Sequence, residues 1–175
     1  MKKKMIIGYT TGVYDLFHVG HLNLLINAKS MCDKLIVGVT IDELVSYKNK
    51  SAVIPYEERI KIIQNLKCVD LAIPQKDMDK FSACKKLKVD YLFVGDDWYS
   101  TEKWEDYENE LSKIGTEVIY FPYTTHISST KLRLFLWVIL SRISFLLLII
   151  SISPSSYFIN TGIFVILNVL ISSFV

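Results

Sequence analysis

Two histidines three residues apart, His18 and His21, form the pattern in this chain that most clearly suggests chemistry. They follow a short apolar run and a glycine-containing turn, and they stand at the start of a helical pattern over 21–31. The first turn of a helix presents unpaired N–H groups and the positive end of a dipole, so it attracts anions. Two imidazoles on one side of that turn could donate hydrogen bonds to phosphate oxygens. We therefore predict a phosphate site; a structural pair is the alternative, and further Cys or His ligands for a metal are not nearby.

The segment around these histidines, 11–21 (TGVYDLFHVGH), resembles the HxGH signature of the nucleotidyltransferase superfamily. Its form is similar to that of the cytidylyltransferase branch, above all the glycerol-3-phosphate cytidylyltransferases, and the resemblance extends over roughly residues 4–133. It implies transfer of CMP from CTP to a small phosphorylated alcohol with release of pyrophosphate. It also implies Mg²⁺ as the companion of CTP, a homodimer, catalytic roles for His18 and His21, and a set of nucleotide contacts in this segment. Those contacts are Thr10, Thr11, Gly12, Tyr14, Asp15 and Gly20.

Two cationic motifs follow in the sequence. Lys48-Asn-Lys50 and the Tyr56-x-x-Arg59 pattern match positions that contact phosphates in the resembled family. The resemblance assigns Lys48 and Arg59 to catalysis and to the second substrate, and Lys50 to the nucleotide. Arginine suits such a task because its fork is always charged. The alternatives are solvated lysines and an exposed helical arginine paired with a neighbouring glutamate.

A pair of adjacent carboxylates ends the fourth predicted strand in Gly95-Asp96-Asp97-Trp98. Carboxylates there could bind Mg²⁺ together with substrate phosphates, or could accept hydroxyl or amino groups of a substrate. By resemblance, Asp97 contacts substrate or base and is the one protein residue considered for the metal, while Asp96 and Trp98 border the substrate. Trp98 could equally serve packing alone.

The last motif is Ile127-Ser128-Ser129-Thr130, at a predicted helix start where hydroxyls and free N–H groups suit a triphosphate. Just before it, Tyr123 and His126 stand where the resembled family has arginine and glycine, and both are assigned to the substrate. The missing arginine leaves other acceptors open, such as phosphoethanolamine, phosphocholine or another phosphate, and also ATP in place of CTP. It also leaves open a catalytically weak nucleotide-binding module.

The composition narrows the class of partner. All 18 acidic residues precede Thr130, and Arg133 and Arg142 are the only basic residues after Leu132, so residues 1–132 are formally neutral. Such a balance excludes the basic field that non-specific nucleic-acid binding requires. Three widely spaced cysteines argue against a zinc site or a disulfide framework.

The elements that would position these motifs alternate between strand and helix. Apolar runs predict strands over 5–10, 34–40, 69–73 (ending at Pro74), 91–94 and 117–121. Helices are predicted over 21–31, 56–66, 80–87 and 104–114, with another starting at 128–129 and a polar loop over 42–51. This order predicts an α/β fold with a Rossmann-like parallel five-stranded sheet covered by helices on both faces. Ligands bind such sheets at the carboxyl ends of the strands, here after the first, fourth and fifth.

The composition changes after Arg133. Residues 134–153 carry one charge and 157–175 none, with a Ser-Pro-Ser-Ser turn between them. Since about 20 apolar residues span a bilayer, we expect a catalytic domain over 1–133 and a hydrophobic helical hairpin over 134–175 that tethers it to the cytoplasmic face of a membrane. An aberrant C-terminus is the alternative interpretation.

Overall fold

The computed structural model describes residues 4–46, 51–95, 102–122, 124 and 126–152. It divides into two compact units, Met1–Ile127 and Ser128–Val175. The first unit alternates strands and helices, and the second contains one long helix among its described residues.

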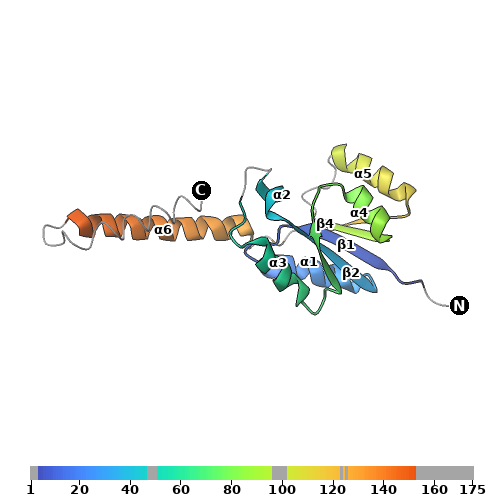
Figure 1. The fold of residues 1–175 in the computed structure, drawn as a ribbon, viewed down its shortest axis with the longest axis horizontal. Coiled ribbons are helices and arrows are strands. Elements are labelled where there is room, and N and C mark those ends of the chain that lie inside the picture. Colours follow the sequence, from blue (N-terminus) through green and yellow to red (C-terminus); the bar gives the residue numbers. More distant parts are fainter. Residues whose placement is uncertain (1–3, 47–50, 96–101, 123, 125, 153–175) are drawn as a thin grey trace. The chain divides into compact units, whose positions relative to one another are not determined.

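A parallel sheet forms the centre of the first unit (Figure 1). Its strands are β1 (Ile7–Gly12), β2 (Lys34–Thr40), β3 (Leu71–Gln75), β4 (Tyr91–Gly95) and β5 (Glu117–Phe121). Their spatial order is β3-β2-β1-β4-β5, and every pairing is parallel. The predicted five-stranded Rossmann-like sheet is therefore confirmed. Strands β2 and β4 are largely apolar runs because both faces of the sheet are covered.

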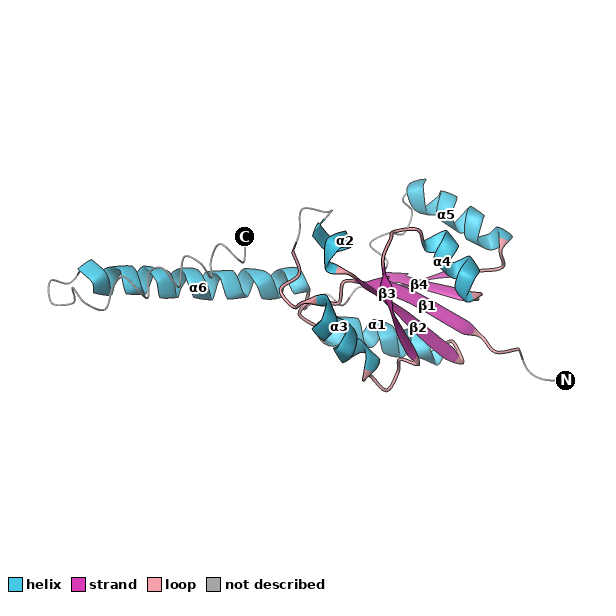
Figure 2. Ribbon diagram, in the orientation of Figure 1, coloured by secondary structure: helices cyan, strands magenta, loops and turns pink. Residues whose placement is uncertain are grey.

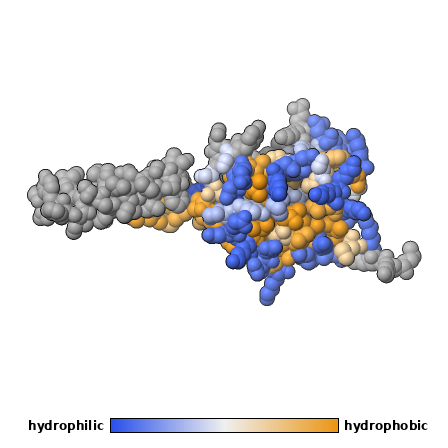
Figure 3. Space-filling model, in the orientation of Figure 1, coloured by the Kyte–Doolittle hydropathy of each residue, from blue (hydrophilic) through white to orange (hydrophobic). Residues whose placement is uncertain are grey.

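Helices cover the two faces of the sheet in pairs (Figure 2). On one face, α1 (Val19–Ser30) and α3 (Tyr56–Gln64) bury Leu25 and Ile63 in one core cluster. On the other, α4 (Lys80–Leu87) and α5 (Glu102–Lys113) bury Cys84 and Leu111 in a second. Apolar and charged side chains both reach the surface of this unit (Figure 3). The two clusters pack the helices against the sheet on both faces and so hold the ends of the strands in place.

Two local features differ from the sequence-based expectation. Strand β3 runs through Pro74 to Gln75 and does not stop at the proline. This is possible because β3 is an edge strand, and the carbonyl of Gln75 faces β2, where it accepts from the N–H of Ile41. Pro74 therefore faces outward, where its missing N–H breaks no ladder bond. The expected polar loop after β2 begins with a short helix, α2 (Asp42–Ser46).

The order in which strands are added to the sheet reverses beside β1. From β1 it runs outward through β2 to β3, and then returns to place β4 on the other side of β1. The carboxyl ends of the neighbouring strands β1 and β4 thus lie where the strand order reverses, the position at which open α/β sheets bind ligands. The HxGH segment leaves β1 at this point.

The second unit contains helix α6 (Ser129–Ile152). Many of its large apolar side chains are exposed: Leu134, Phe135, Leu136, Trp137, Val138, Ile139, Ile143 and Phe145. Among the residues that the structure describes, a helix both long enough and apolar enough to cross a membrane is not found. The expected membrane hairpin is therefore not supported by this structure, and its second arm, 157–175, lies outside the described residues.

Candidate active site

The two histidines of the HxGH segment lie against each other at the start of α1. Their rings stack with centroids 3.9 Å apart and an interplanar angle of 25°. His18 is the N-cap of α1, and its Nδ1 accepts a hydrogen bond of 3.1 Å from the N–H of Gly20. That bond leaves Nε2 of a neutral His18 as the protonated nitrogen. Nδ1 of His21 is buried, and a hydrogen-bond partner for it is not found in the described part of the chain.

Burial keeps this histidine pair neutral. Desolvation, then the neighbouring His18, lowers the pKa of His21 to about 4, although Asp15 opposes the shift. Desolvation also lowers the pKa of His18. At neutral pH each ring therefore carries one N–H and no charge. Neutral rings do not form strong ion pairs with carboxylates, so their N–H groups can donate to an anion. In this state each ring can donate one hydrogen bond to a phosphate oxygen.

Tight backbone geometry surrounds the pair. Tyr14 (φ 54°) and Leu16 (φ 46°) both have left-handed backbone angles, which bulky side chains rarely adopt. A Cβ on Gly20 would approach the ring of His18 to 2.8 Å, so glycine is required where the helix backbone passes the histidine. The hydroxyl of Tyr14 is buried beside Thr10, and its ring packs edge-on against His21 at 5.4 Å. The turn is thus strained and closely packed, as expected where a structure fixes functional groups.

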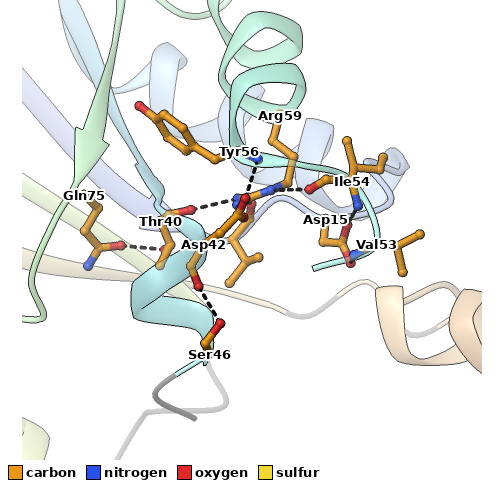
Figure 4. Close-up of polar contacts among 10 residues, drawn as sticks. Asp15, Thr40, Asp42, Ser46, Val53, Ile54, Tyr56, Arg59 and Gln75 are labelled. Carbon is orange, nitrogen blue, oxygen red and sulfur yellow. Dashed lines mark hydrogen bonds and ion pairs between the residues drawn. The ribbon is translucent and has the colours of Figure 1, made fainter. Parts of the chain in front are cut away.

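The Asp15 carboxylate has a different setting from the expected nucleotide contact. It is 3% exposed, and its two oxygens accept hydrogen bonds from the N–H groups of Val53 (3.0 Å) and Ile54 (2.9 Å) (Figure 4). These bonds join the turn after β1 to the segment that precedes α3. The structure therefore gives Asp15 a supporting contact to backbone, and it provides no evidence for the expected contact to nucleotide.

Arg59 is likewise turned inward. Its residue is 0% exposed, and its guanidinium donates to the carbonyls of Ile54 (2.8 Å), Thr40 (2.8 Å) and Val13, and to the carboxylate of Asp42. The alternative of an exposed arginine paired with a glutamate is wrong. The expected phosphate contact also receives no support, because the side chain is fully buried and four of its five N–H donors bond to protein acceptors.

One cation at the site was missed by sequence reasoning. Lys80, the first residue of α4, places Nζ 3.3 Å from the hydroxyl of Thr11 at the carboxyl end of β1, and 6.0 Å from the ring centroid of Trp104. Two signals were available in the sequence: Asp79 in a helix-capping position, and a lysine directly after a predicted strand and turn. Neither shows that the two elements meet, because Lys80 and Thr11 are 69 positions apart.

The remaining expected site residues are distributed as follows. Thr10, Thr11 and Gly12 form the end of β1, at the carboxyl edge of the sheet. Ile127 ends the first unit, and Ser128, Ser129 and Thr130 begin the second, where the hydroxyl of Ser128 accepts from the N–H of Lys131. His126 lies in a turn. Residues outside the described ranges are Lys48, Lys50, Asp96, Asp97, Trp98 and Tyr123.

A parallel α/β sheet with a strand-to-helix turn at its switch point is an architecture that many nucleotide-binding proteins share. Comparison with known proteins makes the assignment specific. The chain belongs to the Cytidylyltransferase-like family, whose sequence pattern matches residues 9–135, and it is a nucleotidyltransferase.

Curated relatives support this assignment. The chain is 38% identical over 132 residues to the glycerol-3-phosphate cytidylyltransferase of Bacillus spizizenii, covering 75% of this chain and 95% of the relative. It is 37% identical to the enzyme of that name from Staphylococcus aureus over 74% of this chain and 92% of the relative. It is also 35% identical to an FAD synthase of Archaeoglobus fulgidus, covering 62% and 79%. Among solved structures, a lipopolysaccharide core biosynthesis protein of Thermoplasma volcanium superposes with a TM-score of 0.60 at 27% identity, covering 71% of this chain and all of that one.

Proposed function

We propose that the chain transfers CMP from CTP to glycerol 3-phosphate, giving CDP-glycerol and pyrophosphate. The observation that carries the proposal is the neutral, stacked His18–His21 pair at the sheet's switch point. It stands in a chain that is 38% identical to an enzyme of that name over 95% of the enzyme's length. The resemblance of the 11–21 segment supports the same substrate.

The chemistry is a direct displacement at phosphorus. A phosphate oxygen of glycerol 3-phosphate attacks the α-phosphorus of CTP, the bond from that phosphorus to the oxygen bridging to the β-phosphate breaks, and pyrophosphate leaves with the bonding electron pair. The protein's task is positioning and stabilisation of charge on the non-bridging and leaving oxygens. His18 and His21 serve this task as neutral hydrogen-bond donors at the N-terminus of α1, whose dipole favours the same negative charge.

Lys80 is our candidate for the phosphate of the acceptor alcohol. Its Nζ reaches the carboxyl end of β1, the strand that leads to the histidines, and Thr11 fixes its direction there. A lysine is a compact charge suited to a terminal phosphate. Lys80 therefore supplies a cation to the site, in addition to the expected Lys48 and Lys50.

Mg²⁺ and the second phosphate-binding segment remain parts of this proposal. Within the described ranges there is no cluster of three or more His, Cys, Asp or Glu that could hold a metal ion. Because Mg²⁺ is commonly bound by one or two carboxylates together with substrate phosphates, we propose an ion held mainly by the phosphates, with Asp97 as a further ligand by resemblance. Bound in that way, Mg²⁺ would neutralise charge on the triphosphate. Ile127–Thr130 would bind the triphosphate through hydroxyl and N–H groups, and Tyr123 and His126 would border the acceptor.

The homodimer and the membrane tether are finer proposals that rest on resemblance and on composition alone. Residues 134–175 contain no acidic residue, and a CDP-alcohol would feed polymers or lipids made at a membrane. Fractionation of full-length protein beside a version lacking 134–175 tests the tether: equal recovery of both in the soluble fraction argues against it.

Pyrophosphate release by the full chain tests the transfer itself. CTP and ATP are each paired with glycerol 3-phosphate, phosphoethanolamine, phosphocholine and FMN, the last because FAD synthases are among the relatives. Release with CTP and glycerol 3-phosphate, and its loss in His21→Ala, is the expected result. A preference for another pair would replace the substrate assignment, and no release with any pair would favour a nucleotide-binding module.

A further inference from the structure

A network of hydrogen bonds around a buried arginine joins the turn after β1 to neighbouring segments of the chain (Figure 4). Its centre is Arg59 on α3, which donates to four acceptors from four different segments. Val13 belongs to the turn after β1, Thr40 ends β2, and Asp42 begins α2, whereas Ile54 precedes α3. One side chain therefore joins four segments that meet at the carboxyl edge of the sheet.

The peptide units flanking Ile54 connect Arg59 to Asp15. The N–H of Ile54 donates to the Asp15 carboxylate, and the carbonyl of the same residue accepts from Nε of Arg59. Asp15 also accepts from the N–H of Val53. Asp15 thus binds the N–H groups of this short segment and Arg59 binds its carbonyl. Displacement of either side chain would free the segment on one side and so weaken the hold of the other.

Asp42 completes the network at its outer side. Its carboxylate accepts from Arg59 through Oδ1 and from the N–H of Tyr56 (3.0 Å) through Oδ2. The side chain of Asp42 is 49% exposed, while that of Arg59 is fully buried. Asp42 therefore supplies the counter-charge that lets a guanidinium remain inside the protein, and it ties the first turn of α2 to the first turn of α3.

The turn supported by this network is strained. Tyr14 and Leu16 flank Asp15 and have left-handed backbone angles of φ 54° and φ 46°. Such conformations persist only when the surroundings over-determine them. The Arg59 bond to Val13 and the Asp15 bonds to Val53 and Ile54 restrain the turn on both sides of Tyr14. His18 follows this turn with only Phe17 between them, so the orientation of its ring depends on these restraints.

We propose that Arg59, Asp15 and Asp42 are positioning residues, which hold the strained 13–16 turn so that His18 and His21 keep their stacked, buried arrangement. The proposal rests on the proposed function for its catalytic meaning, but its geometry can be tested without substrate. It replaces the expected roles of Arg59 as a phosphate ligand and of Asp15 as a nucleotide contact. Because a lysine has one ammonium in place of a planar fork, it cannot reach the acceptors that Arg59 joins.

The test compares Arg59→Lys, Arg59→Met and Asp42→Asn in the full chain, with Thr116→Val as the matched control. Thr116 is 3% exposed, and its hydroxyl donates to the carbonyl of Val89 at the amino ends of β4 and β5. This variant therefore loses a buried hydrogen bond at the end of the sheet opposite to the histidines. Each folded variant is first examined by NMR titration of the histidine rings. Its kcat and KM for CTP and glycerol 3-phosphate are then measured.

We expect both Arg59 variants and Asp42→Asn to raise the pKa of His21 from about 4 toward its ordinary value, since a released turn exposes the ring to water. In the variants kcat should fall by about a hundredfold with little change of KM, as for a misplacement of about 1 Å. Thr116→Val should change neither quantity, even if its stability falls. Asp15→Asn is measured alone and combined with Arg59→Lys. The double variant should lose little more than the more damaged single variant, because both residues bond to the peptide units around Ile54.

Three results would overturn the proposal. One is a His21 pKa that stays at the wild-type value in folded Arg59→Met. Another is a loss that appears mainly in KM for CTP and is largely restored in Arg59→Lys, as expected for a direct phosphate contact. The third is a matching change in Thr116→Val, which would make the effect one of global stability. If the wild type shows no transferase activity, the proposed function fails, while the NMR titration still decides the positioning role.

Discussion

The buried state of His21 gives a stability prediction with a defined pH range. An unfolded histidine has its ordinary pKa of 6.5, and burial lowers the pKa in the folded protein to about 4. The unfolded chain therefore binds a proton first as the pH falls, which favours unfolding. The stability associated with neutral His21 is complete above pH 6.5 and is lost as the pH drops through 6.5 toward 4. At about 1.4 kcal/mol per pH unit, the full loss is about 3 kcal/mol.

Most of that loss falls in an accessible range. Between pH 7 and pH 4.5, His21 alone should lower the free energy of unfolding by about 2 kcal/mol. His21→Gln keeps a polar side chain of similar size but does not titrate, so it should lack this component. Urea unfolding followed by tryptophan fluorescence at several pH values measures both proteins, and the difference between their profiles isolates His21, since most other titrating groups are shared.

The refuting result is a pair of parallel profiles. Equal pH dependence in wild type and His21→Gln would mean that the folded pKa of His21 is close to its ordinary value, and the picture of a neutral, desolvated pair would fall. A profile in which the wild type gains stability on acidification relative to His21→Gln would also refute the neutral pair, because it would mean that folding favours the imidazolium form of His21. NMR titration of the folded protein provides an independent value for the same pKa.

Three further substitutions test other parts of the site and fold. Lys80→Met should raise the KM for glycerol 3-phosphate about tenfold to a hundredfold through loss of a charged hydrogen bond, whereas Lys80→Arg should retain much of the affinity; steady-state kinetics would show an unchanged KM if the lysine has no such role. Gly20→Ala should lower kcat by about tenfold or more because its Cβ would meet the His18 ring at 2.8 Å, and a crystal structure with an undisturbed ring would contradict this. Gly115→Ala should destabilise the protein by about 1 kcal/mol through its φ of 79°, although nothing lies within 4 Å of the added atom, so unchanged denaturation would refute the strain argument.

The strands could be predicted from the sequence because their signal is local. Continuous apolar runs placed β2 and β5 at their observed residues, Lys34–Thr40 and Glu117–Phe121. The parallel sheet followed from the alternation of strands with helices. Pro74 misled the prediction because a local rule about proline ignores whether a strand lies at the edge of its sheet.

The roles of individual site residues were harder to predict because they depend on distant partners. The motif identified Asp15 and Arg59 as important, yet Arg59 meets Val13 across 46 positions and Asp15 meets Ile54 across 39. A charged side chain in a motif is readily interpreted as a ligand contact. The sequence holds no signal that Asp15 and Arg59 bond mainly to backbone groups of the protein itself. Lys80 was missed for the same reason, since its approach to Thr11 exists only once α4 packs on the sheet.

The outward-facing Pro74 also affects how this protein can associate. Strand β3 forms one margin of the sheet, and an unpaired strand margin is a template on which another chain can add a strand. At Pro74 that template lacks a donor, so a second copy cannot continue the ladder there without losing a bond. The same residue that leaves the inner pairing with β2 intact therefore makes extension of the sheet at β3 unfavourable, whereas β5 forms the other margin of the sheet.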